Sequence, residues 1–284
     1  MLALGYYPGC SLEGTARDYA ASIEGVCRLL DIELVELEDW NCCGATAAHS
    51  LDHDLSVALP ARNLFLARQQ GLKDLTAPCA LCYNRLKTAQ KVLKKKATQE
   101  PSAEEDPQVR VWDLVDYFSQ PSIMREIQQR VVRPLHGLRA VCYYGCMVNR
   151  PPKITDAPSW ENPTTMDRLM ETVGAEVLDW PFKTDCCGAS HAVARPDLVS
   201  ALVGKLLKRA LDQGAHCIVV SCQMCHANLD LYQNRIVREQ GLASSIPVFY
   251  FTDLIGFALG EAKARDWIKR HMVDGEPLLA TVGL

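Results

Sequence analysis

The 284-residue sequence lacks the segments that direct a chain into or across a membrane. Its first residues, MLALGYYPGC, contain neither a basic stretch nor a long apolar stretch, so we expect no secretory signal. No segment approaches the eighteen or more apolar residues of a membrane span, and the apolar run at 248–259 is interrupted by Thr252 and Asp253. We therefore expect a cytoplasmic protein with no direct membrane insertion.

The sequence also lacks two common redox signatures and any excess of positive charge. It has no C-x2-C-x2-C-x3-C-P run of a cubane ferredoxin and no G-x-G-x-x-G fingerprint of a flavin or nicotinamide site. The net charge of −4 gives no general basis for binding nucleic acid. The only basic run, Lys91–Lys96, suits the C-terminal end of a solvated helix. Any redox chemistry would therefore need electrons from a partner.

Cysteine, by contrast, is abundant and patterned. Ten of the thirteen cysteines fall into two copies of one arrangement, C…CCG…CxxC, with similar spacings. The first copy consists of Cys10, Cys42, Cys43, Cys79 and Cys82. The second consists of Cys146, Cys186, Cys187, Cys222 and Cys225. Each half of the chain therefore has its own set of thiols, and each set is expected to bind something.

These sets favour a metal over structural disulfides. A chain of this length, with 48% hydrophobic residues, can bury a large core without covalent crosslinks. In a reducing cytosol, clustered cysteines are more often metal ligands or catalytic thiols than bridges. Zinc takes four ligands, usually from two closely spaced pairs. Five thiols that include an adjacent pair instead favour an iron–sulfur cluster, and the glycine that follows the pair can donate its N–H to sulfide.

The elements around the cysteines repeat as well. The first half predicts strands at 2–7, 32–37 and 74–77 and helices at 19–30, 55–70 and 81–92. The second half predicts strands at 140–144, 176–179 and 217–221 and helices at 165–173 and 198–212. The segment Thr98–Gln108 is the clearest loop, and an insertion around Pro151–Pro163 lengthens the second copy.

This alternation predicts an α/β fold of two pseudo-symmetric Rossmann-like βαβ halves with mostly parallel sheets. We place the boundary near Arg133 and Pro134, which gives an N-terminal domain at 1–133 and a C-terminal domain at 134–284. Every patterned cysteine follows a predicted strand. The cysteines are therefore expected at the carboxyl ends of the strands, where such sheets bind ligands.

The paired pattern C-x31–39-C-C-G-x33–34-C-x-x-C resembles the cysteine-rich CCG domains found in the B subunit of heterodisulfide reductase and in its relatives. The resemblance covers nearly the whole chain, including Tyr143–Met147 and Glu161-Asn162-Pro163. The forms Asn-Cys-Cys-Gly-Ala and Ala-Leu-Cys-Tyr-Asn look more like bacterial members than the methanogen enzyme.

The resemblance implies two noncubane [4Fe-4S] clusters, one held by each complete set of five cysteines. It also implies a disulfide or related sulfur substrate that is cleaved or formed between the clusters in one-electron steps. The implied partners are a small ferredoxin-like protein with cubane [4Fe-4S] clusters and, through it, a flavin-bearing protein of the same complex. Two alternatives remain: an electron-relay subunit of another CCG-domain complex that oxidises sulfur compounds, lactate or glycerol phosphate, and a zinc-bound interaction module.

The remaining candidates are histidines and three further cysteines. His49, His191 and His226 are candidate proton donors to product thiolates, although a polar loop role suits the first two equally well. Cys222 to His226 also reads as the C-x-x-C-H signature of haem attachment, but the repeat already accounts for both cysteines. Cys27, Cys142 and Cys217 lack a place in the pattern and are expected to pack in the core.

Overall fold

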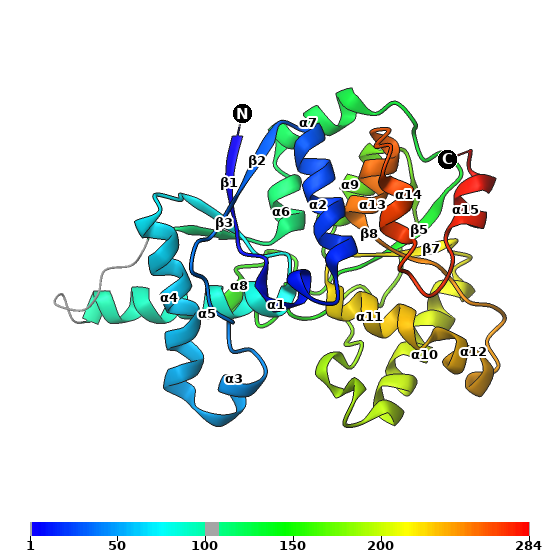
Figure 1. The fold of residues 1–284 in the computed structure, drawn as a ribbon. Coiled ribbons are helices and arrows are strands. Elements are labelled where there is room, and N and C mark those ends of the chain that lie inside the picture. Colours follow the sequence, from blue (N-terminus) through cyan, green and yellow to red (C-terminus); the bar gives the residue numbers. More distant parts are fainter. Residues whose placement is uncertain (1, 100–107, 284) are drawn as a thin grey trace.

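The computed structural model describes residues 2–99 and 108–283, which fold into two similar α/β halves (Figure 1). The strands are β1 (Leu2–Tyr6), β2 (Ile32–Glu36), β3 (Asp74–Thr76), β4 (Arg110–Trp112), β5 (Arg139–Tyr143), β6 (Glu176–Val177), β7 (Cys217–Val220) and β8 (Val248–Tyr250). The first sheet has the order β2-β1-β3-β4 and the second β6-β5-β7-β8. Every pairing is parallel, so the predicted α/β fold with two similar halves is confirmed.

Helices connect and cover the strands of each half. The first half contains α1 (Gly9–Glu13), α2 (Arg17–Leu29), α3 (Ala47–Leu51), α4 (His53–Gln69), α5 (Ala80–Gln99), α6 (Leu114–Phe118) and α7 (Pro121–Arg130). The second contains α8 (Pro152–Thr155), α9 (Thr165–Thr172), the 3-10 helix η1 (Ala189–Ala192), α10 (Pro196–Asp212), α11 (Gln223–Leu231), α12 (Gln233–Gln240), α13 (Phe251–Ala258), α14 (Ala264–Ile268) and α15 (Glu276–Thr281). No helix in the described ranges combines the length and apolarity needed to cross a membrane.

The predicted elements are present, most with bounds within one or two residues of those predicted, and two differ more. The helix α5 continues through Thr98 and Gln99, which were predicted to start a loop. Most of that predicted loop, residues 100–107, lies outside the described residues. The strand β6 has two residues rather than the four predicted, because only Glu176 and Val177 pair with β5. The boundary near Arg133 stays a prediction. It falls in the connection between α7 and β5, where the backbone N–H groups of Val132 and Arg133 both donate to the Ala258 carbonyl.

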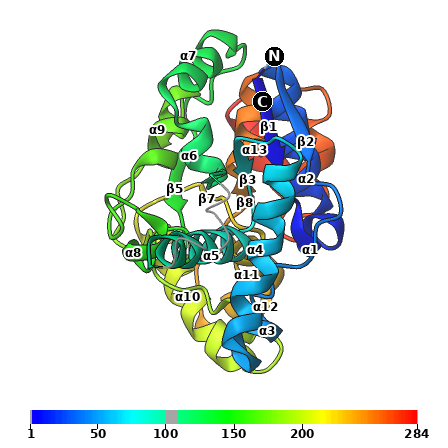
Figure 2. The ribbon, with the colours of Figure 1, turned by 90° about the vertical axis from the view of Figure 1, so that its left-hand side faces the viewer.

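The two halves share one hydrophobic core because helices of each half pack on the other. The helix α2 lies against α13, and the turned view shows the same pairing (Figure 2). The Tyr19 ring of α2 stacks on Tyr250 with ring centroids 4.0 Å apart, and its hydroxyl donates to the Ser221 carbonyl at 2.8 Å. The Ser22 and Thr252 hydroxyls also form a buried hydrogen bond of 2.6 Å. These contacts join α2 of the first half to the strand ends of the second.

A second contact between the halves joins α5 to the chain after β5. The Asn84 amide donates to the carbonyls of Met147 and Arg150 at 2.9 and 3.0 Å. The Tyr83 hydroxyl donates to the Thr155 carbonyl at 3.2 Å. The insertion predicted around 151–163 therefore begins with a segment that binds the first half.

The α2–α13 contact depends on two glycines. A Cβ on Gly25 of α2 would lie 2.4 Å from Cζ2 of Trp267, and a Cβ on Gly256 of α13 would lie 2.3 Å from Cζ3 of the same ring. A glycine within a helix normally costs about 1 kcal/mol relative to alanine. The two glycines leave the space that the Trp267 indole of α14 fills between α2 and α13.

We expect Gly256→Ala to lower the free energy of unfolding by about 1–3 kcal/mol, because overpacking against Trp267 outweighs the gain in helix propensity. Urea unfolding of the metal-free chain measures this change. The matched control is Gly204→Ala in α10, also a buried glycine, where the atoms nearest the new Cβ belong to the movable end of the exposed Gln240 side chain. The control should change stability by less than about 1 kcal/mol, because the lost Gln240–Ser200 hydrogen bond and the gain in helix propensity are of similar size. Equal effects of both changes would contradict this account of the helix contact.

Candidate functional site

The ten patterned cysteines lie where the parallel strands end. Cys10 follows β1, and Cys79 follows β3 directly. Cys146 and Cys222 follow β5 and β7 in the same way, and the two CCG loops follow β2 and β6. Because the strands of each sheet are parallel, their carboxyl ends meet at one edge, as in other ligand sites of this fold class. The predicted placement of the cysteines at the strand ends is therefore confirmed.

Sulfur atoms from distant parts of each half come together in the same way. The Sγ atoms of Cys43 and Cys82 are 3.3 Å apart, and those of Cys187 and Cys225 are 3.7 Å apart. In both pairs the second CCG cysteine meets the last cysteine of the C-x-x-C segment. All thirteen cysteines lie in the described residues, and all are free thiols.

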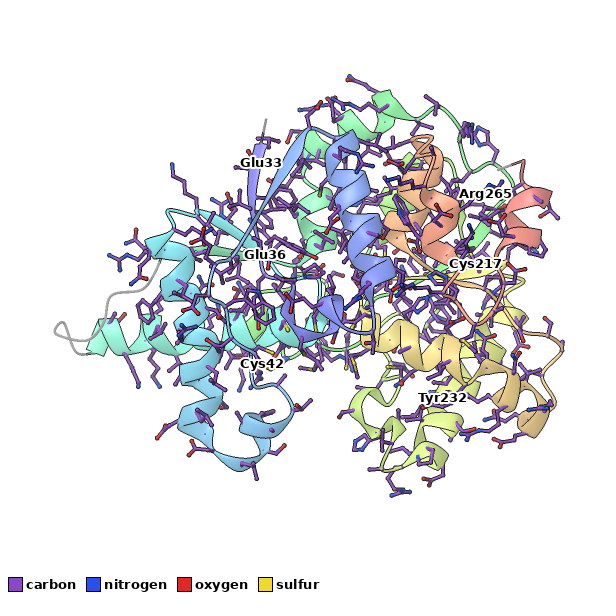
Figure 3. The ribbon with its side chains drawn as sticks, in the orientation of Figure 1. Glu33, Glu36, Cys42, Cys217, Tyr232 and Arg265 are labelled. Carbon is purple, nitrogen blue, oxygen red and sulfur yellow. The ribbon has the colours of Figure 1, made fainter. Side chains whose placement is uncertain are left out.

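Each set extends from the interior to the surface. The buried members are Cys43, Cys79 and Cys82 in the first half and Cys187, Cys222 and Cys225 in the second. The outer members are the exposed Cys10, Cys42 and Cys186 and the half-buried Cys146. Figure 3 places Cys42 beside α3, at the lower end of the molecule. A group bound by either set would therefore have one face in the core and one face near solvent.

Glycines allow the backbone to approach sulfur closely. The N–H of Gly44 points at the Cys42 Sγ at 3.5 Å, and the N–H of Gly188 points at the Cys186 Sγ at 3.3 Å. A Cβ on Gly9 would lie 3.1 Å from the Cys82 Sγ, and a Cβ on Gly145 would lie 2.9 Å from the Cys225 Sγ. Both of the last two residues have positive φ, at 65° and 69°. A larger side chain at either position would occupy the space next to the thiols.

A tyrosine in each half supports the CCG loop and was missed by the sequence analysis. The Tyr7 hydroxyl donates to the Asn41 carbonyl at 2.8 Å, and the Tyr143 hydroxyl donates to the Asp185 carbonyl at 2.6 Å. Each acceptor immediately precedes the cysteine pair. Burial, followed by the nearby thiols of its own half, raises the pKa of each phenol. The sequence does show this pair, since each tyrosine lies three residues before the first cysteine of its set.

The sulfur–sulfur contacts divide the thiols into proton donors and proton acceptors. A hydrogen bond from Cys82 lowers the pKa of Cys79 to about 6, and one from Cys146 lowers the pKa of Cys186 to about 6. A hydrogen bond from Cys225 lowers the pKa of Cys187 to about 7. The donating thiols have raised pKa values for the same reason. Several thiols therefore ionise near neutral pH, and the thiolate is the form that binds metals.

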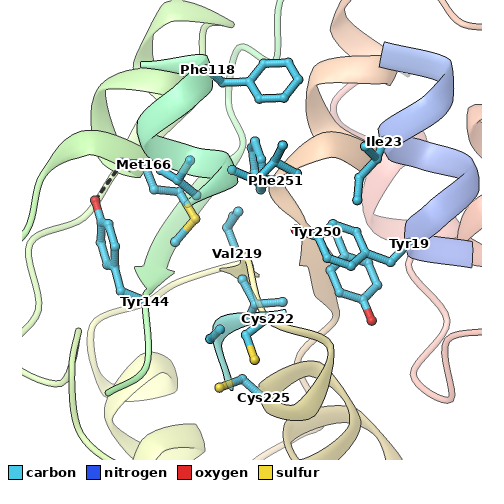
Figure 4. Close-up of a cluster of buried hydrophobic side chains, with 14 of the residues drawn as sticks. Tyr19, Ile23, Phe118, Tyr144, Met166, Val219, Cys222, Cys225, Tyr250 and Phe251 are labelled. Carbon is cyan, nitrogen blue, oxygen red and sulfur yellow. Dashed lines mark hydrogen bonds between the residues drawn. The ribbon is translucent and has the colours of Figure 1, made fainter. Parts of the chain in front are cut away.

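A small cavity adjoins the second set at the contact between the halves. Its walls include Ala80 and Leu81 from the first half, together with Cys146, Cys187, Cys222 and Cys225 from the second. Figure 4 shows Cys222 and Cys225 at the foot of the hydrophobic cluster that contains Val219 and Tyr250. The buried Gln223 of the second half lies close enough to Cys79 of the first half to help lower the pKa of that thiol. The two sets of cysteines are therefore neighbours across the contact between the halves.

The three histidine candidates occupy different environments. His49 in α3 and His191 in η1 are both exposed. His191 is close enough to Cys186 for its charge to lower the pKa of that thiol. His226 is buried: its ring stacks on Tyr250 at 4.3 Å, and its Nε2 lies 3.1 Å from the Val248 carbonyl. Burial, followed by the charge of the neighbouring His271, lowers its pKa well below the ordinary value, so it is neutral at pH 7.

The three unpatterned cysteines are fully buried in the core, as expected. Burial raises the pKa of Cys27 and of Cys217 to about 12, and it raises that of Cys142 well above its ordinary value. They remain thiols at neutral pH. Within residues 2–99 and 108–283, no group of three or more Cys, His, Asp or Glu side chains is arranged to hold a single metal ion.

In the metal-free chain at pH 7, we expect iodoacetamide to alkylate Cys186 at least about tenfold faster than Cys42. Both are exposed, but the pKa of Cys186 is lowered to about 6, whereas burial raises that of Cys42 above its ordinary value. Cys186 should therefore reach its full rate as the pH rises from 6 to 7, while the Cys42 rate still increases above pH 9. Peptide mass spectrometry measures both rates, with the buried Cys217 as an unreactive control. Similar rates for the two cysteines at pH 7 would contradict this division of the thiols.

Comparison with known proteins supplies relatives along almost the whole chain. The chain is 29% identical over 280 residues to the 8-methylmenaquinol:fumarate reductase membrane anchor subunit of Wolinella succinogenes, covering 96% of this chain and 98% of that protein. It is 26% identical over 296 residues to the B subunit of the ferredoxin/F420H2-dependent CoB-CoM heterodisulfide reductase of Methanosarcina acetivorans, covering 99% and 97%. The names of both relatives describe subunits of reductases.

A solved structure agrees on the fold. A Helicobacter pylori protein described as hypothetical superposes with a TM-score of 0.69 at 11% identity over 96% of this chain. The chain spans about half of that protein, 52% of its length, so the likeness concerns the fold alone.

The family model of the cysteine-rich CCG domain matches the chain twice, at residues 4–87 and 140–230. These two segments begin near β1 and β5 and end after the C-x-x-C segment of each half. They therefore contain all ten patterned cysteines and together make up more than half of the chain. The chain belongs to the cysteine-rich CCG domain family.

Proposed function

We propose that this chain is the catalytic iron–sulfur subunit of a heterodisulfide reductase-like complex. The observation that carries the proposal is the presence of two complete five-cysteine sets at the strand ends, with the C-x-x-C segment of the first set and four cysteines of the second lining one small cavity. The relatives named as B subunits of heterodisulfide reductases, at 26–27% identity over most of the chain, support it. At the coarser level, the family and its relatives support an oxidoreductase subunit that contains iron–sulfur clusters and assembles with partners.

The residues present fit such clusters. Each half provides five thiols, several of which ionise near neutral pH, and glycines that leave the space beside sulfur open. We assign Cys10, Cys42, Cys43, Cys79 and Cys82 to a first noncubane [4Fe-4S] cluster. We assign Cys146, Cys186, Cys187, Cys222 and Cys225 to a second. Soft thiolate ligands are those that iron–sulfur clusters require.

The reaction sets the requirements on the two halves. Reducing a disulfide RS–SR′ to RSH and R′SH consumes two electrons and two protons, and one iron–sulfur cluster usually transfers one electron at a time. Two bound clusters would supply the two one-electron transfers. The chain itself would hold the disulfide beside the cavity lined by Leu81 and Cys146. The volume of that cavity, about 20 Å³, has room for about one water molecule, so its walls would have to move apart to admit a substrate.

Protons must reach the product thiolates from groups near the outer cysteines. Among the histidine candidates, His191 suits this role best because it is exposed and lies close to Cys186. His49 follows the other CCG loop and is equally exposed. His226 is a weaker candidate, since it is neutral and its ring stacks on Tyr250 inside the core.

An electron-relay subunit of another CCG-domain complex is the second candidate. It is favoured by the 29% identity to a subunit of a fumarate reductase, because the reduction of fumarate involves no disulfide. Reduction of candidate disulfides by the iron-loaded chain with an artificial electron donor separates the two proposals. The catalytic proposal requires turnover by the chain itself, and the relay proposal requires its absence.

The proposed partners are a small ferredoxin-like protein with cubane [4Fe-4S] clusters and, through it, a flavin-bearing protein of the same complex. Two exposed apolar side chains support a docking face on the outer side of the cysteines. Leu51 ends α3 after the first CCG loop with 84% of its side chain exposed, and Val193 follows η1 after the second with 92% exposed. Both segments lie at the lower end of the molecule in Figures 1 and 2. A partner there would approach the outer cysteines of both sets.

Four further assignments complete the proposal. We propose a cytoplasmic location and two domains, at 1–133 and 134–284, each of which contains one set of cysteines. The substrate class is a disulfide or another sulfur–sulfur compound, and the chain would bind no nucleic acid.

We predict about eight irons and eight acid-labile sulfides per chain purified without oxygen, and no stoichiometric zinc. Cys43→Ser and Cys187→Ser should each remove about half of the iron and abolish disulfide reduction, because a serine binds iron poorly. The matched controls are Cys27→Ser and Cys217→Ser, which place a hydroxyl in the core and should cost stability but not iron. Zinc in place of iron, or equal iron loss from the control changes, would contradict the assignment of the cysteine ligands.

We also expect Leu51→Ser and Val193→Ser each to weaken binding of a ferredoxin-like partner about tenfold without loss of iron. Each change removes an apolar contact at the edge of the proposed interface. Titration calorimetry with the purified partner measures the affinity, and one partner should bind per chain. Val132→Ser, at an exposed position between α7 and β5, is the control and should leave binding unchanged. Two partners per chain, or an unchanged affinity in both variants, would place the interface elsewhere.

A further inference from the structure

The side chain of Gln223 is buried but has no conventional partner. It is 4% exposed, and neither its Nε2 nor its Oε1 makes a hydrogen bond within the described part of the chain. Native structures rarely leave both ends of a buried amide unpaired, because the group loses its water without compensation. A residue in this state is one that a ligand of the site would satisfy.

The position of Gln223 links the two sets of cysteines. It lies between Cys222 and Cys225 in the first turn of α11, so its backbone belongs to the second set. Its amide nevertheless lies close enough to Cys79, a member of the first set, to help lower the pKa of that thiol, although it makes no hydrogen bond of normal geometry there. The walls of the adjoining cavity show the same proximity, since Ala80, which follows Cys79, lines it together with Cys222 and Cys225.

The equivalent position in the first half cannot play this part. The two segments are Cys79-Ala80-Leu81-Cys82 and Cys222-Gln223-Met224-Cys225, so the counterpart of Gln223 is Ala80. An alanine side chain has no hydrogen-bond donor. The pseudo-symmetry of the halves is therefore broken at the position where each C-x-x-C segment faces the other set.

We infer that Gln223 is a positioning residue for the first-half cluster: its amide N–H donates to Cys79 or to the sulfide bound there, and this makes the cluster easier to reduce. The inference rests on the proposed function, because it requires both clusters. Hydrogen bonds to cluster sulfurs favour the reduced, more negative form and are a principal means of setting the potential. One half of the molecule would thus adjust the redox balance of the other.

The test is a redox titration of the iron-loaded chain, followed by electron paramagnetic resonance. Gln223→Met removes the donor but keeps the length of the side chain. It should disfavour reduction of the first-half cluster about tenfold, equivalent to about 59 mV for one electron, and leave the second-half cluster unchanged. Cys42→Ser and Cys186→Ser identify the two signals, since each replaces an outer ligand of only one cluster. Met224→Leu, one residue further along and lining the same cavity, is the matched control and should shift neither signal.

Stability of the metal-free chain separates this role from a structural one. Without a cluster the amide makes no hydrogen bond of normal geometry, so Gln223→Met should leave the urea midpoint unchanged or raise it. A lower midpoint with no change in either potential would overturn the inference. Unchanged potentials together with a raised KM for the disulfide would also overturn it, because the amide would then bind substrate. In both cases the proposed function survives, whereas a chain that takes up no iron overturns both.

Discussion

Each half of this protein has to keep several sulfur anions next to one another and partly out of water. Burial penalises a thiolate strongly, so the charge has to be offset locally. Arg85 is a nearby positive group that helps to lower the pKa of Cys43. The compensation comes mainly from dipoles: neighbouring S–H groups, the N–H groups of Gly44 and Gly188, and helix N-termini. The rest of the fold places these dipoles next to the thiolates.

The parallel sheet is the feature that places these dipoles beside the cysteines. A strand followed by a helix places the helix N-terminus at the carboxyl end of the sheet, so one connection supplies both a cysteine and a favourable dipole. The pairs β3–α5 and β7–α11 each carry a C-x-x-C segment at this junction. The CCG loops have no long helix of their own at that point, and tyrosine hydroxyls hold their backbone instead. Each half therefore holds its cysteines with two different local structures: a helix N-terminus at the C-x-x-C segment and a tyrosine hydroxyl at the CCG loop.

Much of this arrangement could be predicted from the sequence because the relevant signals are local. The spacing of the cysteines, the alternating elements and the internal repeat were enough to predict the fold and to place Cys10 and Cys79 after their strands. Other features depend on contacts between residues far apart in the chain. Gln223 and Cys79 are separated by the length of a whole repeat, so nothing near either residue indicates that they meet. The short length of β6 could not be predicted for a similar reason, since the extent of its pairing depends on β5 rather than on its own residues.

The exchange of helices explains how two similar halves can become different sites. Because α2 packs on α13, the second set rests on a stack of Tyr19, Tyr250 and His226. In the first half the position of His226 is occupied by Tyr83, which bonds to Thr155 of the other half instead. The second site is thus supported by the Tyr19 side chain of the first half, whereas Tyr83 of the first site is held by the backbone of the second half. A substitution at such a contact changes one site without changing its counterpart, so the two sets could diverge in electronic properties while the strand ends that hold the cysteines remained the same.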